Sequence, residues 1–442
     1  MKTKITNREI WSIALPIMLG NMAQTIINFT DTAFLGHLGV VALGASMLAG
    51  LFYFVFTTVA AGFAVGVQII IARRFGEKNY GRIGVIFEHG SLFVFVLGLL
   101  LFSILYLFSD RLLLWLIDSP NIYEVSLDYI QYRQFGIIFV CFNFLYRALY
   151  VGISNTKVIT YSTIIMAVVN VALDYALIFG NFGFPQMGVG GAALASLCAE
   201  LAAFVFFTVY SYITLHQRHF GMFKAYRLET QLMGSIVKIS APTMIQKLLS
   251  FGVWFIFFVL IEKMGETATG ISSITRSVYM ILITPCFAFS TTTNTLVSRI
   301  IGAGHPEMVF STINKVIKNC LICTLPIIII VAIFPVQIAS IYTSDLSFAQ
   351  LTIPSILVIC GATIFQGIGN AYFEAVSGTA NTSAALYLES VVLVVYVIFI
   401  WVVTHLTTRV ELVWTVEILY GILIGLLCCL YMKFARWSNK TI

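Results

Sequence analysis

Apolar segments long enough to cross a bilayer recur from one end of this sequence to the other. The hydrocarbon core of a membrane is about 30 Å thick, and about 20 helical residues cross it. The runs are too long and continuous for barrel strands, and in lipid a helix satisfies its own backbone polar groups. We therefore predict an all-α integral membrane protein with twelve transmembrane helices, at roughly 10–35, 42–71, 84–108, 127–150, 158–180, 188–215, 236–261, 268–300, 316–343, 351–376, 383–405 and 411–434.

The composition supports the same class. Of the 442 residues, 60% are hydrophobic and 10% are charged, whereas a soluble globular chain carries about 25% charged residues. The net charge of +6 is modest and the basic residues are scattered. The expected partner is therefore the lipid bilayer, and nucleic acid is not expected.

Basic residues gather in alternate connections between the predicted helices. The connection between the second and third helices carries Arg73, Arg74, Lys78 and Arg82, and the N-terminal tail and three later segments on the same side are similarly basic. The positive-inside rule then places both termini in the cytoplasm of a multi-pass bacterial inner-membrane protein. The short polar start and the long first apolar run predict a retained first helix rather than a cleaved signal peptide.

The chain also repeats itself. A shift of 226 residues places Pro16 on Pro242, Gly39 on Gly265, Arg73 on Arg299, and Asn155 on Asn381. We predict two six-helix lobes, residues 1–222 and 223–442. An even number of crossings gives both lobes the same topology, with a pseudo-two-fold axis along the membrane normal. Two such lobes with a cleft between them are typical of alternating access, so the repeat favours a transporter over a duplicated channel or membrane enzyme.

Polar residues form a stripe in the first and fifth helices. Asn21, Gln24, Asn28 and Asp31 are spaced to share one helical face, and Asn170 and Asp174 share another. Both carboxylates fall in the outer half of the bilayer, where they could share a proton or coordinate Na⁺ with amide oxygens. The alternative is that Asp31 is solvated at the outer mouth and Asp174 caps a helix contact.

Further polar residues complete the candidate sites of the first lobe. In the sixth helix Ser196 and Glu200 are four residues apart, so they share a face. We take Gln24 and Ser196 as candidate cation ligands beside Asp31, Asn170 and Asp174. Asn28 and Glu200 are candidate substrate contacts.

The second lobe does not duplicate the carboxylate pair, because Asp31 corresponds to Phe257 and Asp174 to Ile400. Its polar residues lie elsewhere, and Gln366, Asn370 and Glu374 recur every four residues along one face. Two readings stay open: a buried ion-pair network that fixes helix packing, or a polar wall that binds substrate. The candidate residues of this lobe are Lys247, Arg276, Gln366, Asn370, Glu374 and Glu389.

These segments together resemble a known family. The stretches from Pro16 to Gly39, from Arg74 to Arg82 and from Gly152 to Thr156, with their repeats from Pro242 and Gly378, are similar to the multidrug and toxic compound extrusion (MATE) family over nearly the whole chain. The resemblance implies an antiporter driven by H⁺ or Na⁺ that exports amphipathic, often cationic, organic compounds. Its expected partners are small organic molecules, and we expect a monomer.

The resemblance also bears on individual residues. The family shares an aspartate in the first helix, which Asp31 matches, and its DinF-like branch adds residues that Gln24, Asn170 and Asp174 match. The NorM-like branch has two acidic residues in the second lobe, but their places here hold Ser250 and Gln366. This departure argues against a NorM-like cation site in the second lobe.

Two other functions were considered. A lipid-linked oligosaccharide flippase of the same superfamily is the alternative transporter, but Arg147, Lys247 and Arg276 are few and are balanced by acids. An integral-membrane enzyme lacks support, since no catalytic or phosphate-binding motif is present. The C-x-x-C of Cys320 and Cys323 lies in an apolar run without a second pair, which indicates packing. No cofactor or structural metal is expected.

Overall fold

The computed structural model describes residues 5–117, 119–215, 220–222, 224, 227–343 and 345–437. Within these residues it contains helices and no strand, and twelve helical segments are long and apolar enough to cross a membrane. The prediction of an all-α integral membrane protein with twelve transmembrane helices is confirmed.

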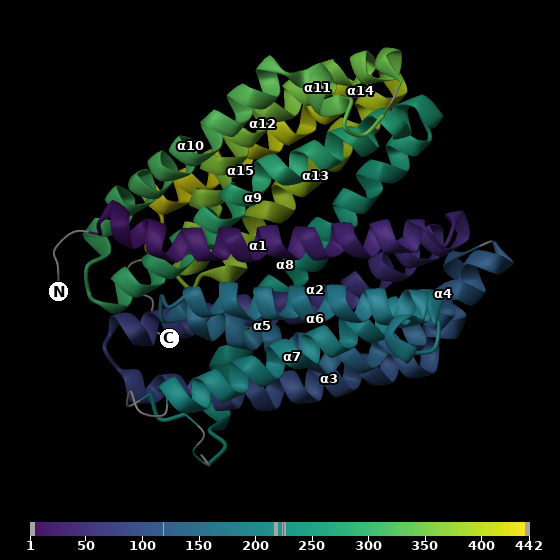
Figure 1. Cartoon of the computed structure of the whole chain (residues 1–442). Coiled ribbons are helices and arrows are strands. Elements are labelled where there is room, and N and C mark those ends of the chain that lie inside the picture. Colours follow the sequence, from purple (N-terminus) through teal and green to yellow (C-terminus); the bar gives the residue numbers. More distant parts are fainter. Residues whose placement is uncertain are drawn as a thin grey trace. The chain divides into compact units, whose positions relative to one another are not determined.

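The first six crossings are built from seven α-helices (Figure 1). They are α1 (Asn7–Gly36), α2 (Val40–Gly76), α3 (Tyr80–Leu116), α4 (Pro120–Arg133), α5 (Ile137–Gly152), α6 (Lys157–Phe179) and α7 (Gly188–Leu215). The fourth crossing is interrupted: a 3₁₀ turn at Gln134–Gly136 separates α4 from α5. A 3₁₀ turn inside a long helix changes the direction in which neighbouring side chains point.

The last six crossings comprise eight α-helices. They are built from α8 (Thr230–Glu262), α9 (Glu266–Gly302), α10 (Val309–Ile333), α11 (Pro335–Ala339), α12 (Leu346–Gly378), α13 (Thr382–Leu406), α14 (Val410–Trp414) and α15 (Val416–Phe434). Here α11 is a short helix after α10, and α14 and α15 together form the twelfth crossing.

The 226-residue repeat extends to the backbone. The bounds of α2 and α9 differ by 226 at both ends, and so do the start of α4 and that of α12. Left-handed residues at helix ends repeat as well: φ is +116° at Gly39 and +111° at Gly265, and Ser154 (+59°) corresponds to Ala380 (+69°). Positive φ is costly for a side chain other than glycine, so these turns are specific features common to both lobes.

Two compact units can be separated by their internal contacts. Unit N is Leu19–Met244, and unit C is Met1–Met18 together with Ile245–Ile442. The chain changes unit after Met18 and after Met244, which are again 226 residues apart. The predicted lobe boundary at 222–223 lies among residues that are partly outside the described ones, and it stays a prediction.

Unit C therefore includes the beginning of α1, the first helix of the first lobe. Unit N includes the beginning of α8, the first helix of the second lobe. In unit C, Trp11 of α1 donates from Nε1 to Oδ1 of Asn319 at 2.8 Å, and Glu9 is paired with Arg299. In unit N, Thr243 of α8 donates to the carbonyl of Gly62 at 2.6 Å.

Small residues let α8 approach α2 closely in unit N. A Cβ added at Gly62 would lie 2.5 Å from Cα of Met244, and one at Gly66 would lie 2.6 Å from Cα of Ser240. Both obstacles are backbone atoms, so no side chain can be accommodated. Spacing of this kind, with small residues four apart, is typical of helix pairs in membranes.

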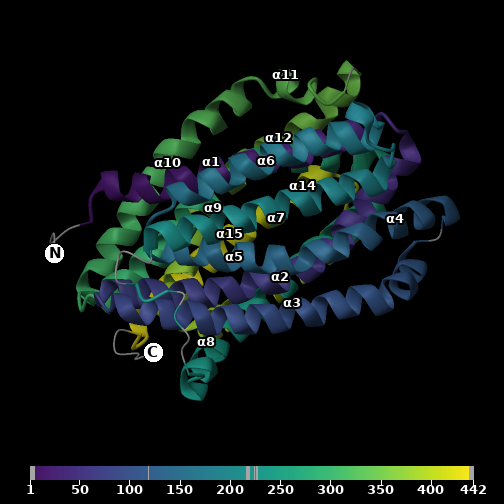
Figure 2. The same ribbon diagram turned by 60° about the horizontal axis from the view of Figure 1, so that its bottom comes forward.

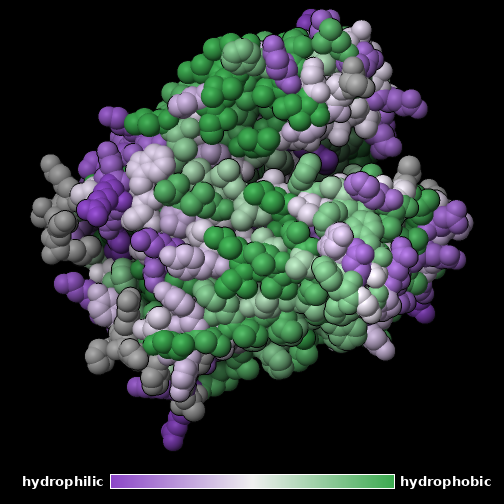
Figure 3. Space-filling view, viewed as in Figure 1, coloured by the Kyte–Doolittle hydropathy of each residue, from purple (hydrophilic) through white to green (hydrophobic). Residues whose placement is uncertain are grey.

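Within each unit the helices run side by side. In unit N, α6 packs along α7 and α2 along α5; in unit C, α12 packs against α9 and α15 (Figures 1 and 2). On the face drawn in Figure 3, apolar side chains cover the middle of the helices and polar ones gather toward their ends. Exposed Leu92, Val96 and Leu100 of α3 contribute to the apolar surface, which suits contact with lipid.

Candidate cation and substrate sites

Two carboxyl groups of unit N meet between α1 and α6. The carboxyl groups of Asp31 and Asp174 are close enough to interact electrostatically. Asp174 is 0% exposed and Asn170, one turn earlier on α6, is 1% exposed. Among the described residues, neither oxygen of Asp174 nor either polar atom of the Asn170 amide has a hydrogen-bond partner. Two carboxylates at this range need a proton or a cation between them.

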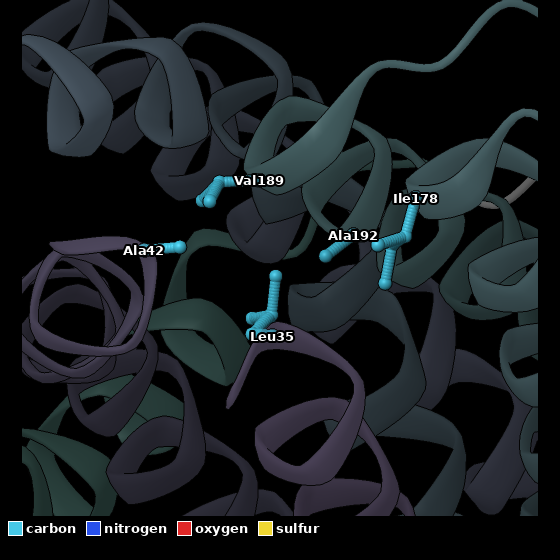
Figure 4. Packing of buried hydrophobic residues seen from close by; sticks show 5 residues of the cluster. All are labelled: Leu35, Ala42, Ile178, Val189 and Ala192. Carbon is cyan, nitrogen blue, oxygen red and sulfur yellow. The ribbon is translucent and has the colours of Figure 1, made fainter. Parts of the chain in front are cut away.

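An apolar layer lies one helical turn beyond this pair. Leu35 of α1, Ile178 of α6 and Ala192 of α7 form a buried cluster with Ala42 and Val189 (Figure 4). Leu35 is four residues after Asp31, and Ile178 is four after Asp174. Apolar side chains at these helix ends therefore cover one side of the carboxyl pair and keep water away from it.

Ser196 has a corresponding place on α7. It is four residues after Ala192 and half-buried, so its hydroxyl is one turn from the apolar layer. The predicted ligands Asp31, Asp174 and Ser196 thus each lie one turn from a member of that layer.

The remaining polar residues of α1 follow the predicted stripe. Gln24 donates to Oδ1 of Asn28 at 3.4 Å, and Asn21 accepts from Arg147 of α5 at 3.2 Å. Gln24 therefore has Asn28 as its partner in this structure, while its place as a cation ligand stays a prediction.

Glu200 has a partner that the sequence did not reveal. Its carboxylate forms a two-pronged ion pair with Arg133 at 2.5 and 2.6 Å, and the two side chains are 11% and 13% exposed. The guanidinium also lies 4.3 Å above the ring of Tyr53. Arg133 is the last residue of α4, directly before the 3₁₀ turn. A buried charge pair of this geometry holds α4 against α7 and engages the charge of Glu200.

In unit C the glutamates are held by neutral donors. Oε1 of Glu389 accepts from Ser250 at 2.7 Å and from Tyr420 at 3.1 Å, while its buried Oε2 has no partner in the part of the chain that the structure describes. Glu374 accepts from Asn294 at 2.9 Å.

The predicted basic residues of this unit are nearby but not paired. Lys247 is close enough to act electrostatically on Glu374 and Glu389, but within the described chain it forms a direct ion pair with neither. Arg276 lies 5.4 Å from the ring of Phe258, a cation–π contact.

The predicted polar face of α12 continues onto α15. Asn370 donates to Gln366 at 3.2 Å, and Gln366 donates to Glu417 at 2.9 Å. Glu417 also accepts from Tyr279 at 3.0 Å and from Tyr396 at 2.8 Å. Three donors around one buried carboxylate form a satisfied network, and Glu417 was not among the predicted residues.

Comparison with known proteins bears on what these sites serve. The MatE family model matches residues 16–176 and again residues 242–402, two matches displaced by the same 226 residues. Together they cover most of the chain. The chain belongs to the MatE family.

Relatives agree with this assignment. The MatE chain is 26% identical over 377 residues to the probable multidrug resistance protein NorM of Thermotoga maritima, covering 85% of this chain and 80% of the relative. It is 24% identical over 388 residues to the probable multidrug resistance protein YoeA of Bacillus subtilis, covering 87% and 83%. As a transporter of this family, it is not an enzyme.

Solved structures share its fold. A MOP-superfamily transporter from Pyrococcus furiosus superposes with a TM-score of 0.89 at 19% identity, covering 98% of this chain and 96% of that one. An outward-facing multidrug resistance MATE transporter has the same TM-score, identity and coverage. The predicted two-lobe, twelve-helix architecture of a MatE transporter is confirmed.

Ser250 and Gln366, the neutral residues at the two NorM-like acidic places, both have partners in this MatE chain. Ser250 donates to Glu389 of α13, and Gln366 donates to Glu417 of α15. Two carboxylates from other helices thus lie beside the two neutral residues. Glu389 was among the candidate residues predicted from the sequence, whereas Glu417 was missed, although a glutamate in an apolar run was a usable signal for both.

Proposed function

We propose that this protein is an H⁺- or Na⁺-coupled antiporter that exports amphipathic, often cationic, organic compounds by alternating access. It would work in a bacterial inner membrane with both termini in the cytoplasm. The names of its relatives, which are called probable multidrug resistance proteins, support drug export. The coupling site would be Asp31 and Asp174 with Asn170, Ser196 and Gln24.

One observation carries the proposal. Buried polar atoms of Asp31, Asp174 and the Asn170 amide have no partner among the described residues, and unpaired polar groups in a bundle interior are expensive. A proton shared between Asp31 and Asp174, or a Na⁺ that also takes the amide oxygen of Asn170, would satisfy them. The apolar layer above them would strengthen that interaction by keeping water away.

Coupling then follows from charge. Without a bound cation, the two carboxylates repel each other across the α1–α6 contact. With a cation bound between them, both carboxylates are attracted to it. The bound ion therefore favours one packing of α1 against α6, and Pro16 gives α1 a place to bend because proline lacks a backbone N–H. A ligand that prefers one of two states shifts the equilibrium, and the shift is reciprocal with substrate binding.

Transport in proteoliposomes tests the function. Export of a fluorescent organic cation should require an imposed H⁺ or Na⁺ gradient, each applied alone. Asp31→Asn and Asp174→Asn should each abolish gradient-driven export while the proteins still insert and fold, because a neutral amide cannot bind the coupling ion with the same strength.

A matched control separates this from a general loss of charge. Asp110→Asn removes an exposed carboxylate that pairs with Tyr123 at the end of α3, and it should leave export unchanged. Full ion-driven transport by Asp31→Asn or Asp174→Asn would remove that residue from the mechanism.

A further inference from the structure

Arg147 of α5 contacts the polar stripe of α1, and the partner that it has within the described chain is a neutral amide. It donates to the amide oxygen of Asn21 at 3.2 Å, and no carboxylate of a described residue lies within ion-pairing distance of it. A guanidinium held inside a helix bundle without a counter-charge is costly. Arg133 of the same unit shows the contrast, because its charge is engaged by Glu200.

The environment of Arg147 is that of a polar surface rather than of lipid. Asn21 shares its helical face with Gln24, Asn28 and Asp31. Arg147 is half-buried as a residue, and its one hydrogen bond to a described residue is the one to Asn21. A guanidinium offers five donors in a planar fork that matches a carboxylate or phosphate, and Asn21 occupies part of that capacity.

The repeat shows that this charge is specific to unit N. The positions that correspond to Asn21, Arg147, Ala148 and Thr163 are Lys247, Phe373, Glu374 and Glu389. At these four positions unit N has one positive charge, and unit C has one positive and two negative charges, a formal balance of −1. Arg147 in unit N can therefore pair with an anion, whereas Glu374 and Glu389 in unit C can pair with cations.

We propose that Arg147, oriented by Asn21, binds the anionic oxygens of an amphipathic ligand, a carboxylate or a phosphate. The inference rests on the proposed export function and narrows its substrate class: compounds that carry an acidic group beside a cationic one are bound, and not simple cations alone. Two sources have this chemistry, an exported compound with a carboxylate and the phosphate of an anionic lipid.

Two dyes that differ in one group test the proposal. Rhodamine B carries a carboxylate and a cationic ring system, and its ethyl ester keeps the rings without the acid. Arg147→Gln should weaken binding of rhodamine B to the purified protein about tenfold or more, the scale of one lost charge-assisted hydrogen bond. The affinity for the ester should change less than about twofold on the same reasoning.

Two further variants keep the test decisive. Lys157→Gln removes an exposed positive charge at the start of α6 and should affect neither dye. Arg147→Lys keeps the charge but not the planar fork. If the glutamine variant does not fold, the lysine variant should still weaken binding of the acid several-fold and spare the ester.

The lipid source is tested in parallel by melting temperature. If a lipid phosphate is the ligand, phosphatidylglycerol should stabilise the wild-type protein over phosphatidylcholine and should not stabilise Arg147→Gln. Equal affinities of wild type and variant for both dyes, with an equal response to phosphatidylglycerol, would overturn the proposal, as would equal loss of both dyes. A wild-type protein that exports neither dye refutes the export function instead.

Discussion

At the scale of single residues, the acidic side chains inside the helical units illustrate three kinds of environment. Glu200 has an opposite charge, Glu417 has three neutral donors, and Asp31 with Asp174 has a like charge. The first two environments are satisfied and stabilise helix contacts. The third is incomplete without a proton or an ion, and that is why the carboxyl pair is the best candidate for coupling.

The buried pair Arg133–Glu200 can be compared with an exposed pair of the same geometry. Glu200→Gln leaves the Arg133 charge buried without a partner and should lower the free energy of unfolding by about 3–5 kcal/mol. Arg82 and Glu229 also form a two-pronged pair, at 2.7 Å, but their side chains are 39% and 42% exposed. Glu229→Gln should have little effect on thermal melting in detergent. Equal melting temperatures for the two variants would contradict the structural role given to Arg133.

The charges of unit C permit a second test. Glu374 accepts from Asn294, and Lys247 is near Glu374 but not bonded to it. Lys247→Met should therefore cost less stability than breaking a direct buried pair. If Glu374 binds substrate, Glu374→Gln should weaken binding of cationic compounds and leave neutral ones unaffected. If Lys247→Met lowers the melting temperature strongly, and adding Glu374→Gln restores it, Lys247 and Glu374 form an ion pair.

At the scale of helices, much of the structure could be predicted from the sequence. Hydrophobic length located all twelve crossings, and the 226-residue repeat matched Gly39 with Gly265, both of which have positive φ in the structure. The 3₁₀ turn after Arg133 could not be predicted because the sequence there reads as a continuous helix, and neither could the ion pair that Arg133 forms with Glu200. Glu200 is 67 residues away from Arg133, so spacing along one helix cannot connect them.

The close contact of α2 with α8 leads to a prediction about glycine. Gly66→Ala places a methyl group against backbone atoms of Ser240 and should destabilise unit N by about 1–3 kcal/mol, the usual cost of overpacking. Gly50, on the same helix, has no atom within 4 Å of an added Cβ. Gly50→Ala should keep or raise the melting temperature, because alanine favours the helix. The contact is refuted if both variants melt alike.

At the scale of the whole molecule, the duplication is the dominant feature. Helix bounds, left-handed turns and the two MatE matches all share the 226-residue offset. The polar residues do not share it: Asp31 and Asp174 correspond to Phe257 and Ile400. The scaffold has thus remained symmetrical while the chemistry of the two lobes has diverged, and we infer that coupling belongs to the first lobe.

The orientation in the membrane that the basic residues predict can be measured. In a background without the eight native cysteines, Lys78→Cys should react with a membrane-impermeant maleimide only after the cells are opened. Lys263→Cys, also at an exposed site, should react in intact cells because it lies an odd number of crossings away. Labelling of residue 78 in intact cells would show that the orientation is the opposite of the predicted one.

The change of unit at Met18 and Met244 has a consequence for biosynthesis. A ribosome that has passed residue 244 has supplied every residue of unit N, whereas unit C also needs the first eighteen residues of the chain and everything after 244. The earliest segment to emerge is thus among the last to find its final neighbours, and insertion machinery or a chaperone must tolerate it until the C-terminal helices arrive. Because each unit includes residues from both repeats, a half-length protein with one repeat could complete a unit of this kind only if the beginning of its first helix packed into a second copy.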